Sequence, residues 1–112
     1  MKKPEAVLVI TNFPDRESAL RLANKLVESR LAACINVMAE CTSVYRWKRK
    51  IETAPEVPVF IKTMKTHFPQ VEKLVKQYHP YELPELIAVP ISIGSAAYLE
   101  WVATETLPIK NN

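Results

Sequence analysis

A continuous apolar run near the start of the chain, Ala6 to Thr11 (AVLVIT), constrains the fold more than any other feature. β-branched residues dominate the run, and no polar positions alternate with them. This pattern is typical of a strand that is covered on both faces. Helices of the same chain can cover one face of a sheet, so the run also points to an interface on the other face.

Two amphipathic helices are predicted around this strand. Apolar residues at spacings of three and four predict a first helix that begins after Asp15, whose carboxylate is a suitable N-cap, and ends near Arg30. The same spacing predicts a second helix over 66–78, which ends where His79 precedes a proline. Ser95 is expected to cap a short final helix, with three large residues facing inward: Tyr98, Trp101 and Val102.

Extended patterns predict the remaining elements: strands over 31–38, 42–47, 51–61 and 86–93, with a basic turn at 48–50. The resulting order, β-α-β-β-α-β-α, predicts an α+β, ferredoxin-like split βαβ fold, that is βαββαβ plus a C-terminal helix. We expect a four-stranded antiparallel sheet with the helices on one face. The other face would carry exposed apolar side chains, which favours a closed oligomer with the sheets packed inward: Val44, Trp47, Ile51, Val57 and Val59.

Length and composition exclude several classes of protein. The 112 residues predict a single domain over 1–112, with frayed ends at 1–4 and 108–112. No targeting segment or membrane span is apparent, and two cysteines do not make a disulfide framework, so we expect a cytoplasmic protein. A single glycine argues against a glycine-rich phosphate loop. The net charge of +3 is too small to predict binding to DNA or other nucleic acid.

The segment from His79 to Glu85 (HPYELPE) concentrates polar chemistry in front of an apolar strand. It holds an imidazole, a phenol and two carboxylates, and its two prolines stiffen it as a turn. Such a segment fits a binding site, and it also fits an ordinary helix-to-strand connection.

Five segments in order resemble the CutA family of divalent-cation tolerance proteins: 31–36 (LAACIN), 43–47 (SVYRW), Glu56 with 61–63 (IKT), 79–85 and 98–101 (YLEW). The resemblance implies a ferredoxin-like subunit, a stable homotrimer, and kinship with the trimeric PII signalling proteins. It also implies an association with copper and other divalent ions, and for animal members with acetylcholinesterase anchoring. It implies no chemical reaction, and the chain offers no readable set of nucleophile, base and orienting residue, so we do not expect an enzyme.

The residues themselves supply few metal ligands. Copper prefers imidazole, thiolate and thioether groups. Cys34 and Cys41 are seven positions apart, which on a regular strand places them on opposite faces. Compared with the family pattern, Tyr78 replaces a histidine and Ile10 replaces a cysteine. We therefore expect no required cofactor, and only weak binding of copper or another divalent cation through His79.

A hypothesis without metal uses much the same residues. We expect six side chains to converge with His79 at a cleft between subunits: Tyr45, Trp47, Glu56, Lys62, Tyr81 and Glu85. One interpretation is an interfacial network of paired charges, and the other is an anion or small-molecule site. The resemblance thus implies a homotrimer of divalent metal ion (copper) tolerance, which we expect to be cytoplasmic, with a PII-like small-molecule-binding signalling or scaffold trimer as the alternative.

Overall fold

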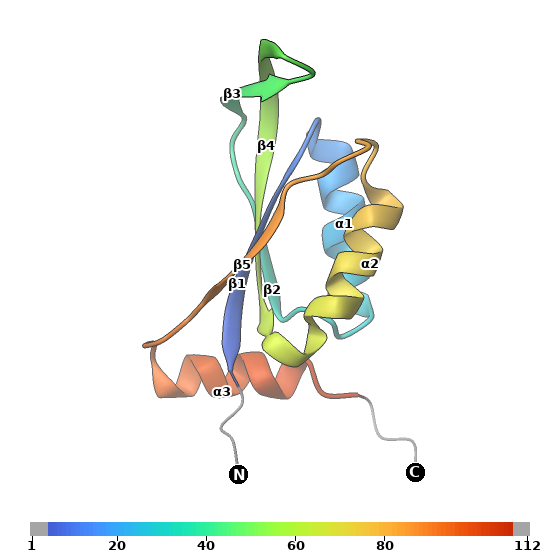
Figure 1. Ribbon diagram of the computed structural model, residues 1–112. Helices are drawn as coiled ribbons and strands as arrows, with labels where there is room; N and C mark the ends of the chain where they lie inside the picture. Colours follow the sequence, from blue (N-terminus) through green and yellow to red (C-terminus); the bar gives the residue numbers. More distant parts are fainter. Residues whose placement is uncertain (1–4, 109–112) are drawn as a thin grey trace.

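The computed structural model describes residues 5–108, so the predicted frayed ends 1–4 and 108–112 lie outside the described residues except for Pro108. Strands and helices follow one another in the predicted order (Figure 1). The elements are β1 (Ala6–Phe13), α1 (Arg16–Glu28), β2 (Cys34–Val37), β3 (Cys41–Trp47), β4 (Lys50–Met64), a short 3-10 turn η1 (Lys65–His67), α2 (Phe68–Tyr78), β5 (Leu86–Pro90) and α3 (Ala96–Glu105).

The sheet has the strand order β2-β4-β1-β5, and its neighbouring strands are antiparallel. β1 lies in the middle, where Val9 pairs with Ile61 of β4 on one side and with Ala88 of β5 on the other. α1 and α2 lie on the same side of this sheet (Figure 1). This arrangement confirms the predicted ferredoxin-like split βαβ fold.

Local chemistry explains where the predicted elements begin and end. The Asp15 carboxylate accepts a hydrogen bond from the Ser18 main-chain N–H at 2.8 Å, which confirms the predicted N-cap of α1. β2 is shorter than predicted, because the Leu31 N–H still donates to the Leu26 carbonyl at the end of α1. β5 is also shorter than the predicted strand over 86–93. β5 ends at Pro90, which pairs with Val7 near the start of β1, so the residues after Pro90 have almost no partner strand left.

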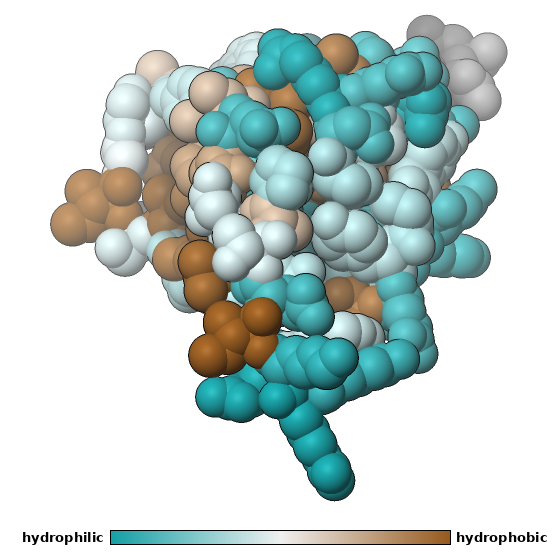
Figure 2. Space-filling model, turned by 90° about the horizontal axis from the view of Figure 1, so that it is seen from above, coloured by the Kyte–Doolittle hydropathy of each residue, from teal (hydrophilic) through white to brown (hydrophobic). Residues whose placement is uncertain are grey.

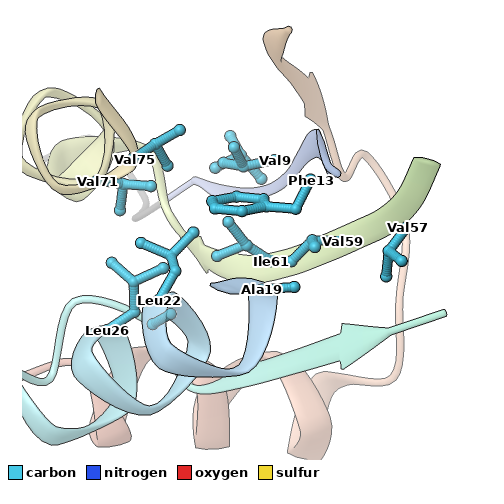
Figure 3. Packing of buried hydrophobic residues seen from close by; sticks show 12 residues of the cluster. Val9, Phe13, Ala19, Leu22, Leu26, Val57, Val59, Ile61, Val71 and Val75 are labelled. Carbon is cyan, nitrogen blue, oxygen red and sulfur yellow. The ribbon is translucent and has the colours of Figure 1, made fainter. Parts of the chain in front are cut away.

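The main core lies between the sheet and the two helices. Val9, Phe13 and Ile61 project from β1 and β4 toward Leu22 of α1 and Val75 of α2 (Figure 3). All five side chains have no solvent exposure. Burying a side chain of this size contributes about 1.5–3 kcal/mol, so this layer holds α1 and α2 on the sheet.

The opposite face of the sheet is apolar, but two of the residues predicted on it lie elsewhere. Val57 and Val59 are 4% and 0% exposed and belong to the helix-covered core, so their prediction as open-face residues was wrong. Side chains alternate along a strand, and both valines share their face with the buried Ile61. Across the other face, Ile10 pairs with Phe60 and with Ile87.

Hydrophobic surface is unevenly distributed over the molecule. Seen from above, brown surface gathers mainly on the left, and the right side, where α1 and α2 lie in Figure 1, is largely teal and pale (Figure 2). Val44 and Ile51 of the hairpin are 68% and 69% exposed, and Ile87 and Val89 of β5 are also exposed. The side of the sheet away from α1 and α2 therefore keeps apolar surface in contact with water.

The final helix packs differently from the other two. Val102 of α3 is buried against Ala6 and Met64, in a small cluster apart from the main core. Tyr98 and Trp101 were predicted to face inward, but both are exposed and contact each other, with ring centroids 5.6 Å apart. The reason is that α3 meets only one end of the sheet, so a single stripe of the helix is covered within the chain.

The β3–β4 hairpin projects beyond the body of the molecule (Figure 1). Its turn residues Lys48 and Arg49 have φ values of 48° and 71°. Glycine is favoured in this left-handed region because it has no Cβ. The tip of the hairpin thus holds two cationic residues in a strained backbone.

Candidate functional site

The segment 79–85 connects α2 to β5 and lies at the end of β1. His79 is the C-cap of α2, and its main-chain N–H donates to the Val75 carbonyl at 2.9 Å. Its ψ angle of 131° is extended, as the following Pro80 requires. The helix therefore ends at the predicted position, and the imidazole is held at the start of the connection.

Both ring nitrogens of His79 are hydrogen-bonded. Nε2 donates to the carbonyl oxygen of Asn12, and Nδ1 accepts the main-chain N–H of Tyr81 at 3.1 Å. This pair of bonds needs the neutral ring with its proton on Nε2. Burial lowers the pKa of His79, while the bond to Asn12 and the charge of Glu56 act in the opposite direction. The ring also packs against Phe13, with centroids 4.3 Å apart.

Asn12 is a site residue that the sequence analysis missed. Its main-chain oxygen holds His79, and its side-chain amide donates to Oε1 of Glu85 at 2.9 Å. One residue at the end of β1 thus fastens the first and last residues of the connecting segment. The sequence signal that could have revealed Asn12 is its position as a polar residue directly after the apolar run 6–11.

A hollow of about 970 Å³ lies between the hairpin and the connecting segment. We call it the hairpin pocket. It is lined by Ser43, Val44, Tyr45, Trp47 and Glu56 from the hairpin and by residues 80–87. The structure thus brings together five of the predicted site residues: Tyr45, Trp47, Glu56, Tyr81 and Glu85.

Lys62, the sixth predicted residue, lies away from the hairpin pocket within one chain. It faces away from Val57, Val59 and Ile61, as predicted, and its Nζ donates to Oδ1 of Asn36 at 2.6 Å. Lys62 is therefore on the apolar face of the sheet, in a row with Leu8. Its convergence with the pocket residues of another subunit stays a prediction.

Glu56 is the most enclosed charged residue of the hairpin pocket. It is 8% exposed, and no hydrogen bond or ion pair joins its carboxylate to any group within residues 5–108. Its charge reaches the neighbouring phenol, since burial and then Glu56 raise the pKa of Tyr81. The Glu56 oxygens are not among the fully buried polar atoms that lack a partner within residues 5–108, so the carboxylate keeps contact with the water of the hollow.

Metal-ligating side chains are dispersed over the described part of the chain. No group of three or more His, Cys, Asp or Glu side chains is arranged to hold a metal ion within residues 5–108. Cys34 is half-buried and Cys41 is exposed, and both are free thiols. Metal coordination by His79 would need one of its two hydrogen bonds to open.

The described helices include none that is both long and apolar enough to cross a bilayer. The fold and the pocket together define a class: a ferredoxin-like α+β protein with one uncovered apolar sheet face and a projecting hairpin beside a ligand-sized hollow.

Comparison with known proteins identifies the family within this class. A family described as "CutA1 divalent ion tolerance protein" matches residues 7–105. The chain belongs to the CutA1 family.

Individual relatives agree with this assignment. The divalent-cation tolerance protein CutA of Thermus thermophilus is 41% identical over 91% of this chain and 98% of its own length. Protein CutA of Mus musculus is also 41% identical, and the match spans 88% of this chain but 56% of the mouse protein. The crystal structure of CutA1 from Shewanella sp. SIB1 matches with a TM-score of 0.89 and 44% identity, over 96% of this chain and 100% of that one.

Proposed function

We propose that this chain acts in divalent-cation tolerance as a cytoplasmic homotrimer in which the three uncovered sheet faces pack together. The observation that carries the assembly is the apolar row formed by Phe60, Ile10 and Ile87 across three neighbouring strands. Each large apolar side chain removed from water contributes about 1.5–3 kcal/mol, which favours association. Family membership supports the link to divalent cations.

Growth of cells tests the cellular role. A strain that lacks the gene should grow less well in elevated copper, and the intact gene should restore growth. A gene carrying Phe60→Glu should fail to restore it, because a carboxylate on the apolar face opposes assembly. Equal copper sensitivity of the strains with and without the gene would contradict the role.

Copper or another divalent cation is proposed to bind weakly through His79. A metal ion must compete with Tyr81 for Nδ1 or with Asn12 for Nε2, which lowers its affinity. Calorimetric titration with copper should give a smaller heat for His79→Ala than for the unchanged protein. His67→Ala is the matched control, since His67 is the other histidine. Identical isotherms for His79→Ala and the unchanged protein would remove His79 as a ligand.

A second function is favoured by the hairpin pocket: a PII-like trimer that binds a small molecule for signalling or as a scaffold. The pocket is large enough for such a ligand and joins aromatic with acidic side chains. Thermal-shift screening tests it, because a ligand at 100 times its Kd adds about 2.7 kcal/mol of stability. We propose binding rather than catalysis, since the imidazole that acid–base chemistry would use is engaged at both nitrogens.

A further inference from the structure

We propose that the hairpin pocket takes a small organic cation, an ammonium group on an apolar skeleton, with Glu56 as its counter-ion. This inference rests on the second function above, that the pocket holds a small molecule. It adds the charge and the shape of that molecule. Three features of the pocket carry it: its charge, its unpaired carboxylate and its aromatic walls.

The charge of the lining has one sign. Glu56, Glu82 and Glu85 contribute carboxylates, and the lining contains no lysine, arginine or histidine. Such a pocket attracts cations and repels anions. The anion that the sequence analysis considered would face three like charges here, so a positively charged ligand fits better.

Glu56 is the strongest of these signals. Its side chain lies at the wall of the pocket and is 8% exposed, yet it has no ion-pair partner within residues 5–108. Its neighbour His79 is held in a neutral form by its two hydrogen bonds, so it does not balance the charge. An enclosed carboxylate is stabilised when a cation joins it.

Aromatic and aliphatic walls complete the pocket. Tyr45, Trp47 and Tyr81 line the hollow, and aromatic faces attract organic cations. Lys48 Nζ already lies over the Trp47 ring, 5.8 Å from its centroid, so Tyr45 and Tyr81 are the rings left for a ligand. Leu83 adds apolar surface. A metal ion prefers several converging ligand atoms, which the described residues do not provide as a group of three. An ammonium ion on an apolar body uses one carboxylate and the rings together.

Three probes of nearly equal shape and different charge test the inference: benzylammonium, benzyl alcohol and benzoate. Their binding to the intact, assembled protein is measured by calorimetry at neutral pH. We expect the cation to bind at least about tenfold more tightly than the neutral alcohol. The anion should bind most weakly. Glu56→Gln should weaken cation binding by about tenfold and leave alcohol binding unchanged.

Two further variants separate the pocket from general surface charge. Glu52→Gln removes a carboxylate of the same hairpin outside the pocket lining, and it should leave binding of the cation unchanged. Tyr81→Leu should weaken binding of the cation more than that of the alcohol. Circular dichroism of each variant reports whether the fold is kept.

The outcomes separate the organic cation from the small-molecule pocket on which it rests, and from the role in divalent-cation tolerance. Preference for the alcohol or the anion, with no effect of Glu56→Gln, would overturn the organic cation and leave a small-molecule pocket. Failure of all three probes to bind would overturn the inference as well, while the role in divalent-cation tolerance is read separately by growth in copper.

Discussion

The main-chain carbonyl oxygen of Asn12 accepts a hydrogen bond from Nε2 of His79, which lies 67 positions further along the chain. This bond fastens the connecting segment to the end of the central strand. It also fixes the tautomer of the ring, because Nδ1 is occupied by the Tyr81 N–H. The position of one wall of the hairpin pocket therefore depends on a neutral imidazole.

The protonation of His79 makes stability depend on pH. Burial lowers the pKa of His79 in the folded protein below its ordinary value of 6.5. At higher pH the ring is neutral in both states. As pH falls through 6.5, the unfolded chain takes up the proton first, so the free energy of unfolding decreases until the lower folded pKa is reached.

Urea unfolding at about pH 8 and about pH 5 measures this effect. His79→Asn should lose less stability than the unchanged protein between these two pH values, because it removes the titrating ring. His67→Asn, at the other histidine, should behave as the unchanged protein does. A pH dependence that survives His79→Asn in full would contradict the role given to His79.

Two buried threonines provide a matched test of hydrogen bonding in the core. Thr11 and Thr63 have no solvent exposure, but the Thr11 hydroxyl has no hydrogen-bond partner within residues 5–108. The Thr63 hydroxyl donates to the Leu31 carbonyl at 2.6 Å. Valine has nearly the same shape as threonine without the hydroxyl.

Thr11→Val should therefore raise the free energy of unfolding by about 1 kcal/mol, because it removes an unpaired polar group from the core. Thr63→Val should lower it by about 1–2 kcal/mol, since it leaves a buried carbonyl unpaired. Chemical denaturation of both variants gives the two values. Loss of stability in both variants to the same extent would show that the Thr11 hydroxyl has a hydrogen-bond partner in the folded protein.

The hairpin turn stores backbone strain at Arg49. Arg49→Gly should raise stability by roughly 1 kcal/mol, because glycine adopts the φ of 71° without steric cost. Lys50→Gly, one residue further into β4, should instead destabilise the protein, since Lys50 is paired within the strand. Thermal unfolding ranks the two variants. A lower melting temperature for Arg49→Gly would indicate that the arginine side chain makes a stabilising contact in the assembly.

Sequence patterns predicted the elements well because each pattern has a local cause. The Asp15 cap, the end of α2 before Pro80 and the order of strands all follow from neighbouring residues. Alternation also placed Lys62 opposite Val57, Val59 and Ile61. It did not tell which of the two faces the helices cover, and the assignment of Val57 and Val59 failed for that reason.

Features that depend on distant partners were harder to predict. The bonds from Asn12 to His79 and Glu85 join residues that the sequence separates by 67 and 73 positions. The exposure of Tyr98 and Trp101 depends on how much of α3 meets the sheet, which the helical pattern alone does not specify. Five residues of the hairpin pocket were predicted as site residues. The excess of carboxylates in its lining was not predicted, because it depends on the fold that places residues 80–87 beside Glu56.

A charge placed on the uncovered face should disrupt assembly. Phe60 pairs with Ile10 in the apolar row that continues to Ile87. Each subunit would bury this row, so Phe60→Glu should lose its oligomeric state. Leu20→Glu is the control, because Leu20 is an exposed residue on α1 of the helix-covered side. Size-exclusion chromatography compares them. Assembly that is unchanged in Phe60→Glu would contradict the proposed interface.

The mass of the intact protein in solution tests the central claim most directly. Sedimentation equilibrium across a range of protein concentrations should give three times the mass of one chain, because copies of the chain cover the apolar side of each sheet. A mass of one chain at all of these concentrations would contradict the account, since the uncovered face would then be stable in water on its own.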